Sequence, residues 1–268
     1  MLRLALVLTA AAFVTFPLMP VQWAAIRLNW PLRRRIPVFY HRMMCRLLGI
    51  RVRNIGAPID ARPLLIVANH SSWMDISILT SLTPVIFVAK SEIARWPLFG
   101  LLAKLQRSVF VERDRRQKTG AVNAEIAQRL AEGDPVLLFG EGTAGDGNRV
   151  MPFRSALIGA ARDAIAASEH VSQVWIQPVS LAYVSQHGIP FGRHLRPRAA
   201  WYGKTSLVPH LKRVARQGAI DVVVTWGEPT RYDADTDRKV LTKLLESSVR
   251  GYTIAALRGA VAASRTVA

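Results

Sequence analysis

A histidine and an aspartate stand five residues apart in the stretch NHSSWMD, residues 69–75. The apolar run LLIVA before it is typical of a buried strand, and the residues after the two serines are typical of a helix. His70 is therefore expected in the turn at the carboxyl end of a strand, with Asp75 in the first helical turns. A carboxylate placed there fixes the imidazole tautomer and stabilises the imidazolium when the other nitrogen takes a proton. The spacing predicts a general base, His70, oriented by Asp75. The alternative is a structural histidine beside a carboxylate at a helix start.

Three glycines in PVLLFGEGTAGDGNR, residues 135–149, follow another apolar run and spell G-x-G-x-x-G, the fingerprint of a dinucleotide-binding loop. That fingerprint requires its third glycine to open a helix, whose N-terminus meets the pyrophosphate. Here Gly145 is followed by DGNRVMPF, whose glycine, asparagine and proline predict a loop, and Glu141 would repel a pyrophosphate. An oxidoreductase with a glycine-rich nucleotide site is therefore only a third hypothesis.

The same loop has a second interpretation, as a binding site for an anion. Glycines permit tight turns and close approach of a ligand to the backbone, so we expect the loop to expose Glu141 and to offer backbone N–H groups. Arg149 and Arg154 follow it, and the arginine fork matches the geometry of a phosphate. The alternative for both arginines is a solvated surface.

Metal ligation has little support in the sequence. No second histidine stands at ligand spacing from His70, and no H-E-x-x-H motif occurs. The chain has one cysteine, Cys45, which excludes a disulfide framework and a cysteine-rich zinc site. We expect neither a metal nor a cofactor.

The chain is strongly basic, with 36 lysines and arginines against 18 acidic residues and a net charge of +18. Such a charge indicates a nucleic acid, an anionic membrane surface, or an acidic substrate or carrier protein as partner. Nine arginines and no lysine precede the first acidic residue, Asp60. Because they adjoin a hydrophobic segment, these arginines favour anionic lipid head groups over nucleic acid.

That hydrophobic segment, residues 4–26, carries no charge. As a helix it would reach about 34 Å, enough to cross a hydrocarbon layer of about 30 Å. Pro17 and Pro20 predict a kink, which leaves a spanning and a re-entrant path open. The arginines from Arg27 onward predict that the rest of the chain lies on the cytoplasmic face of the inner membrane. The alternative is a cleaved signal peptide, which the dense arginines directly after the segment oppose.

Beyond residue 60, short apolar runs alternate with helical patterns. This alternation predicts an α/β domain with a mostly parallel sheet flanked by helices. We expect a membrane anchor with a basic juxtamembrane helical segment over residues 1–58, and the α/β domain over residues 59–268. The expected strands are 64–68, 85–89, 108–112, 136–139, 174–183 and 221–226, and the expected helices lie near 73–82, 96–105, 117–132, 154–167, 207–217 and 236–258.

Four stretches together resemble the signature blocks of the glycerolipid acyltransferases of the lysophosphatidic acid acyltransferase type. The four stretches occur in the family's order and are NHSSWMD (69–75), VFVER (109–113), FGEGT (139–143) and IQPVSLAY (176–183). The resemblance covers roughly residues 60 to 185 and places His70 and Asp75 in the catalytic positions. It also implies that the acceptor head group is bound by Arg113, Glu141, Gly142 and Thr143.

The sequence departs from the family pattern in the third block. Gly140 stands where a proline is usual, and Ala144 stands where an arginine usually follows E-G-T. Arg149 and Arg154 are candidates to replace that arginine. This form of the block, with WYG at 201–203 and PHL at 209–211, is similar to a branch that includes lyso-ornithine lipid acyltransferases.

The resemblance implies acyl transfer without a covalent enzyme intermediate. His70 would take the proton of an acceptor hydroxyl, whose oxygen attacks the thioester of acyl-carrier protein or acyl-CoA as co-substrate. Our leading hypothesis is an enzyme of the 1-acyl-sn-glycerol-3-phosphate O-acyltransferase kind, acting on a lysolipid acceptor at an anionic membrane surface. The alternative is a lyso-ornithine lipid O-acyltransferase. A membrane-anchored nucleic-acid-binding protein is the hypothesis from a different class, but no nucleic acid is expected because it would not explain the ordered blocks.

Overall fold

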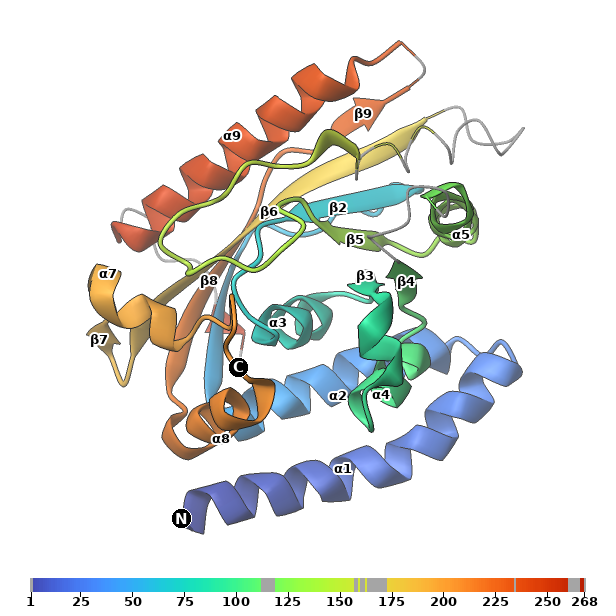
Figure 1. The fold of residues 1–268 in the computed structure, drawn as a ribbon. Coiled ribbons are helices and arrows are strands. Elements are labelled where there is room, and N and C mark those ends of the chain that lie inside the picture. The colour runs from blue at the N-terminus through green and yellow to red at the C-terminus, as the bar shows by residue number, and fades with distance from the viewer. Residues whose placement is uncertain are drawn as a thin grey trace.

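The computed structural model describes residues 2–111, 119–156, 159, 162, 173–233, 235–259 and 266–267. Within these residues, ten strands form one sheet in the order β10-β1-β8-β6-β2-β5-β3-β4, with β7 and β9 also paired to β6 (Figure 1). The strands are β1 (Ile50–Ile55), β2 (Leu64–Ala68), β3 (Ile86–Lys90), β4 (Val109–Val111), β5 (Val136–Phe139), β6 (Val174–Gln186), β7 (Ile189–Pro190), β8 (Ile220–Trp226), β9 (Thr230–Tyr232) and β10 (Thr266–Val267).

The centre of the sheet is parallel. Strand β2 pairs in parallel with β5 on one side and β6 on the other, and β3 pairs in parallel with β5 and β4. The long strand β6 pairs antiparallel with β8, which in turn pairs in parallel with β1. All five residues of β2 are buried, as a continuous apolar run covered on both faces requires. The predicted α/β fold with a mostly parallel sheet is confirmed.

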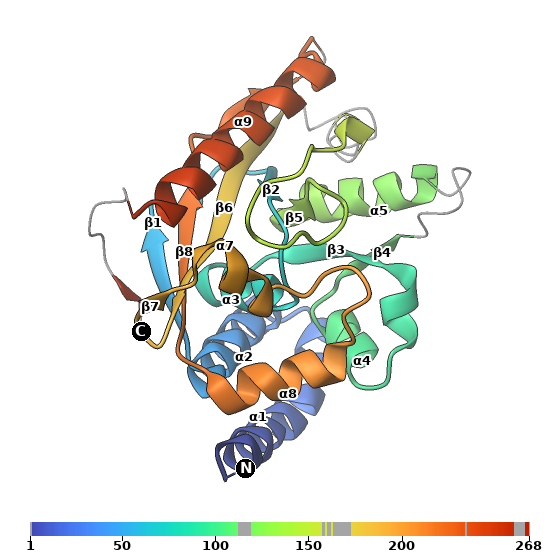
Figure 2. The same cartoon turned by 60° about the vertical axis from the view of Figure 1, so that its left-hand side comes forward.

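Helices cover both faces of the sheet, as Figures 1 and 2 show. Alternate residues of β2 divide between two cores. Leu64 and Ile66 pack with residues of α2 and α3, whereas Leu65 and Val67 pack with residues of α5 and α9. The helices are α1 (Leu2–Arg27), α2 (Leu32–Leu48), α3 (Met74–Leu82), α4 (Phe99–Leu105), α5 (Thr119–Ala131), α7 (Gly192–Leu195), α8 (Leu207–Gln217) and α9 (Arg238–Leu257), with 3-10 turns η1 (Ser91–Arg95) and η3 (Arg196–Arg198).

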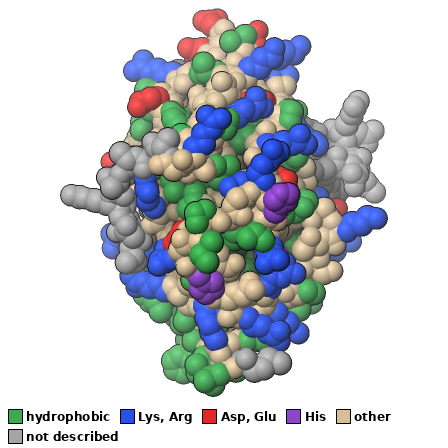
Figure 3. Space-filling model, turned by 90° about the vertical axis from the view of Figure 1, so that its left-hand side faces the viewer, with side chains coloured by type: hydrophobic (Ala, Val, Ile, Leu, Met, Phe, Trp, Pro, Cys, Tyr) green, Lys and Arg blue, Asp and Glu red, His purple; other side chains and the backbone are tan. Residues whose placement is uncertain are grey.

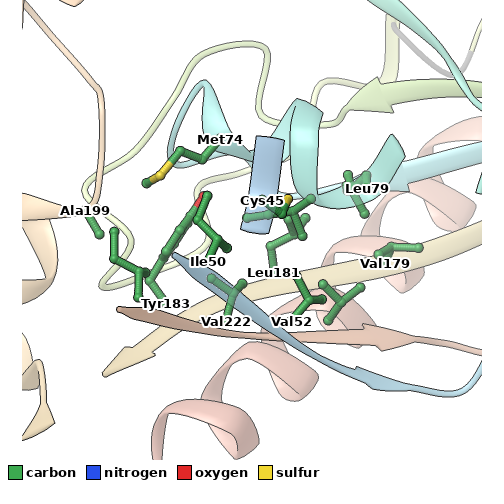
Figure 4. Close-up of a cluster of buried hydrophobic side chains, with 14 of the residues drawn as sticks. Cys45, Ile50, Val52, Met74, Leu79, Val179, Leu181, Tyr183, Ala199 and Val222 are labelled. Atoms are coloured by element: carbon green, nitrogen blue, oxygen red, sulfur yellow. The ribbon is translucent and has the colours of Figure 1, made fainter. Parts of the chain in front are cut away.

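Part of the core lies directly beneath the turn after β2 (Figure 4). Tyr183 of β6 and Met74 at the start of α3 are fully buried in it, together with Cys45 of α2. Burial raises the pKa of the Cys45 thiol to about 12, so the thiol stays protonated. The lone cysteine therefore packs as a small apolar side chain.

Most predicted elements appear within a few residues of their expected bounds, while the short elements β7, α7, β9 and β10 were not predicted. Strand β1 was not expected, and it lies inside the predicted N-terminal segment 1–58 while being part of the main sheet. The predicted division of the chain at residue 58 stays a prediction. The helix expected near 154–167 falls mostly outside the described residues.

Helix α1 is long and apolar enough to cross a membrane, and in the fold it lies along α2, α4 and α8. The Gln22 side chain is buried and donates hydrogen bonds to the carbonyls of Leu105 (2.8 Å) and Arg33 (3.1 Å). Other apolar side chains of α1 face outward, and Phe13 is 80% exposed. In Figure 3, hydrophobic side chains gather at the lower end, where Figure 1 places α1, while lysines and arginines spread over the face above.

Candidate active site

The turn between β2 and α3 carries the predicted histidine and aspartate. The turn forms because an apolar strand, two serines and an apolar helix follow one another in the sequence. In this turn, the backbone N–H groups of Ser71 and Ser72 point at the start of α3. Both N–H groups donate to Oδ2 of Asp75, at 2.7 and 2.9 Å. The carboxylate therefore closes the turn that holds His70 at the carboxyl end of the sheet.

His70 and Asp75 form the predicted pair. Nδ1 of His70 lies 2.8 Å from Oδ2 of Asp75, whose side chain is fully buried, while 18% of the His70 side chain is exposed. Because a carboxylate accepts at Nδ1, the proton belongs on Nδ1 and Nε2 keeps its lone pair. The imidazole stacks on the ring of Phe139, with 3.9 Å between ring centroids and 18° between planes. The pair thus has the geometry that a general base requires.

Tyr183 is a member of this site that the sequence did not reveal. Its hydroxyl donates to Oδ1 of Asp75 at 2.5 Å, so Asp75 accepts four hydrogen bonds in all. Burial, followed by the neighbouring carboxylate, holds the pKa of Tyr183 well above its ordinary value and keeps the hydroxyl a donor. The residue ends the block IQPVSLAY, but only the pairing of β2 with β6 brings it to a residue 108 positions away.

Glu141 is buried, and the prediction that its loop exposes it is wrong. Only 3% of the residue is exposed. Its Oε2 accepts from the backbone N–H of His70 at 3.0 Å, and its Oε1 accepts from that of Met151 at 2.8 Å. The backbone of Gly145 also donates to the carbonyl of His70, at 2.9 Å. The glycine loop thus folds back on the turn between β2 and α3 and fixes the backbone of His70 from both sides.

The burial of Glu141 has a consequence for pH. Burial, against the two backbone hydrogen bonds, raises the pKa of this carboxyl from 4.5 to about 7. The group therefore contributes most stability below its unfolded-state pKa, and this contribution is lost as the pH rises through about 7. We compare the melting temperatures of the wild type and of Glu141→Gln. The difference, wild type minus variant, should decrease as the pH rises from about 5 to about 8.

The comparison of two proteins at each pH isolates this group. His41, whose pKa burial lowers to about 4, acts in the opposite direction but is present in both proteins. The same substitution at the exposed Glu228 is the matched control for the loss of a surface carboxyl. A pH-independent difference for Glu141→Gln would contradict the assignment.

The loop after Glu141 has no helix over residues 141–154, which removes the dinucleotide-binding interpretation. Gly142 has a φ of +70°, the left-handed region that glycine adopts without strain. The Arg154 side chain covers it, because a Cβ on Gly142 would lie 3.0 Å from Cδ of Arg154. Thr143, Arg149 and Arg154 are exposed, and neither arginine has an acidic partner among the described residues. Arg113 lies outside the described residues.

The chain between β7 and β8 also contacts the turn that carries His70. The backbone N–H of Trp201 donates to the carbonyl of Ser71 at 2.8 Å. Nε1 of Trp73 donates to Nδ1 of the buried His210 at 3.0 Å, and Nε2 of that histidine lies 3.2 Å from the carbonyl of Arg198. The stretches WYG and PHL, noted in the sequence, therefore both meet the NHSSWMD block. His210 is a structural residue that fixes the tryptophan next to the turn.

Comparison with known proteins agrees with this geometry. The Acyltransferase family model matches residues 49–182. The chain is 47% identical to the lyso-ornithine lipid O-acyltransferase of Brucella abortus over 96% of both chains, and 46% identical to that of Rhizobium meliloti over 96% of this chain and 88% of the relative. The crystal structure of the 1-acyl-sn-glycerophosphate (LPA) acyltransferase PlsC from Thermotoga maritima has the same fold, with a TM-score of 0.65, 21% identity and coverage of 98% and 96%. With the four sequence blocks, the His70–Asp75 geometry and these matches in agreement, the chain belongs to the acyltransferase family and is a lysolipid acyltransferase.

Proposed function

We propose that this protein transfers a fatty acyl group from a thioester to the hydroxyl of lyso-ornithine lipid. The observation that carries this choice of acceptor is the similarity of 46–47%, over almost the whole chain, to two enzymes with that name. The likeness to an enzyme acting on lysophosphatidic acid is 21% and supports the fold alone. These identities favour lyso-ornithine lipid, the alternative acceptor, over lysophosphatidic acid, the acceptor in our leading hypothesis from the sequence.

The reaction uses the free nitrogen of His70. Nε2 takes the proton of the acceptor hydroxyl while the oxygen attacks the thioester carbonyl carbon, and Asp75 stabilises the imidazolium that forms. When the tetrahedral intermediate collapses, the carbon–sulfur bond breaks and Nε2–H protonates the departing thiolate to give the thiol. One ester forms, one thioester is lost, and the histidine returns to its starting state.

The exposed arginines are proposed to bind the anionic group of the acceptor. Arg154 is the better candidate, because its side chain lies over the Glu141–Gly142 turn, beside Ala144 where the family usually places an arginine. An ornithine carboxylate carries less charge than a phosphomonoester, so one such guanidinium suffices to pair with it. Glu141 acts by holding the catalytic turn, while Thr143 and Arg149 line the outer part of the loop.

Removal of the Arg154 guanidinium should weaken acceptor binding. A hydrogen bond to a charged group contributes about 1.5–3 kcal/mol, so Arg154→Ala should raise the KM for the acceptor roughly tenfold or more, with little change in kcat. Arg149→Ala should have a smaller effect. The exposed Arg193 supplies the matched control, since Arg193→Ala should leave KM unchanged. Equal effects at all three positions would argue for a general charge effect instead.

An acceptor panel tests the proposed function directly. The purified full-length protein should acylate lyso-ornithine lipid at least about tenfold faster than lysophosphatidic acid, a difference of about 1.4 kcal/mol in transition-state binding. Each acceptor is paired with acyl-carrier protein and with CoA thioesters, which also identifies the donor. A preference for lysophosphatidic acid would support a 1-acyl-sn-glycerol-3-phosphate O-acyltransferase instead. The absence of transfer to either acceptor would reject both hypotheses.

The same proposal includes the membrane. Helix α1 docks its Gln22 face on the domain, so its exposed apolar side chains are placed to enter the membrane alongside the domain, with the active site on the cytoplasmic face. The donor is soluble and acidic, and the basic surface suits both it and anionic lipid. Protease cleavage of the domain in sealed right-side-out vesicles, and protection in inverted ones, would contradict this orientation.

A further inference from the structure

An open groove of about 390 Å³ lies at the opposite end of α3 from Asp75. We call it the basic groove, and its lining includes Arg34, Arg35, Val38, Phe39, Arg42 and Leu82. Helix α3 has nine residues, so at about 1.5 Å per residue its far end lies about 12 Å along the helix axis from the catalytic turn. The groove is therefore separate from the site at the carboxyl ends of the strands.

Two guanidinium groups in the basic groove have no acidic partner among the described residues. Arg34 is already paired. Its Nε lies 2.5 Å from Oδ1 of Asp134, and its Nη2 donates to the carbonyl of Glu132 at 3.0 Å. Arg42 donates only its Nε, at 2.7 Å, to the carbonyl of Ser81, which holds the side chain in place while its two terminal nitrogens stay available. Arg35 is exposed and makes no ion pair with any residue that the structure describes. One guanidinium held in place, that of Arg42, and a second one lining the same groove, that of Arg35, suit one phosphate group.

The other walls of the groove are apolar. Phe39 is 55% exposed, and Val38 and Leu82 are half-buried beside it. Trp30, in the connection that leads into α2, is also 44% exposed. A free phosphate or a nucleic acid backbone has no apolar part that could pack against such walls. A phospholipid has both parts, because its phosphodiester is joined to acyl chains. The groove lies on α2, which packs along α1, and the outer face of α1 is apolar. We therefore place the groove at the membrane surface.

We propose that the basic groove binds one anionic phospholipid, with its phosphodiester between Arg35 and Arg42 and the start of its acyl chains along Phe39 and Leu82. The lipid is neither the acyl acceptor nor the acyl donor. It attaches α2 to an anionic leaflet at a defined point, in addition to the apolar face of α1. The site does not depend on the identity of the acceptor, because neither arginine belongs to the catalytic turn.

The test measures binding of a soluble lipid to the full-length protein in a non-ionic detergent. Dihexanoyl-phosphatidylglycerol, titrated below its micelle concentration, should bind with a stoichiometry of one lipid per chain. Dihexanoyl-phosphatidylcholine and inorganic phosphate should bind at least about tenfold more weakly, since the first has no net negative charge and the second no apolar part. Phosphate binding as tight as that of the lipid would overturn the proposal.

Charge-preserving variants separate a built site from diffuse attraction. The double variant Arg35→Lys/Arg42→Lys keeps the net charge but loses both forks, so its affinity for phosphatidylglycerol should fall about tenfold. The matched control Arg193→Lys/Arg198→Lys changes two exposed arginines, in α7 and η3, that do not line the groove, and it should bind as the wild type. Arg154→Ala should also bind normally, which excludes occupancy of the acceptor site. Wild-type affinity in Arg35→Lys/Arg42→Lys would show diffuse attraction and refute the groove.

Discussion

Replacing His70 by alanine should lower the rate of acyl transfer by about 10⁴-fold, the upper end of what general acid–base catalysis contributes. The effect is large because the same nitrogen would serve twice, first as base toward the hydroxyl and then as acid toward the thiol. The backbone of the turn should persist, since its hydrogen bonds to Glu141, Gly145 and Asp75 do not use the imidazole. Lipid binding and the melting temperature should therefore stay close to those of the wild type.

The measurement is a single-turnover rate with saturating acceptor and a labelled acyl donor. His194 is exposed and lies in α7, so His194→Ala makes the same chemical change away from the turn and should leave the rate unchanged. Turnover near the wild-type rate in His70→Ala would refute the catalytic role. Loss of activity in both variants would point to a general defect of the preparation.

Asp75→Asn should lower the rate by about 10²–10³-fold while leaving the protein folded. Oδ2 of Asp75 accepts from Ser71, Ser72 and His70, whereas Oδ1 accepts from Tyr183. An asparagine that keeps its oxygen toward the first three would present its NH₂ to the tyrosine, whose hydroxyl can turn and accept. The tautomer of His70 and the turn survive, so the lost quantity is the negative charge that stabilises the imidazolium.

A double variant makes this prediction sharper. If Asp75 acts through His70, then Asp75→Asn added to His70→Ala should slow the reaction no further, because residues that act as a unit are not additive. Independent effects that multiply would place Asp75 outside the pair. A collapse of the melting temperature in Asp75→Asn would mean that its main contribution is to the fold of the turn.

The sequence predicted this pair because its geometry is local. Only four residues lie between His70 and Asp75, and an apolar strand, a turn with serines and an apolar helix are enough to bring the two side chains together. Strands β2 and β5 were predicted for a similar reason, as uninterrupted apolar runs can only be buried on both faces. Strand β1 was missed because its sequence IRVRNI carries two arginines in a basic region that was interpreted as a helix beside the membrane.

The parts of the site that escaped prediction depend on contacts between distant segments. Glu141 was expected to be exposed because glycines surround it, yet the loop folds over a turn 71 residues earlier and buries the carboxylate. Tyr183 reaches Asp75 only through the register of β2 against β6. The Arg154 side chain lies over Gly142 because the chain after Pro152 runs back to the glycine loop, where the N–H of Arg154 donates to the carbonyl of Gly140. No pattern within a single stretch encodes these approaches.

The first helix has a consequence for anyone who wishes to obtain the protein without detergent. The Arg3 guanidinium donates to the carbonyl of Ala215 near the end of α8 and, at 3.2 Å, to that of Leu48 at the end of α2, so it caps two helices at once. Deleting α1 would leave those carbonyls and the Val7 contact of the core without partners. A water-soluble form should instead keep the helix and exchange its outward residues Phe13 and Phe16 for glutamine or lysine.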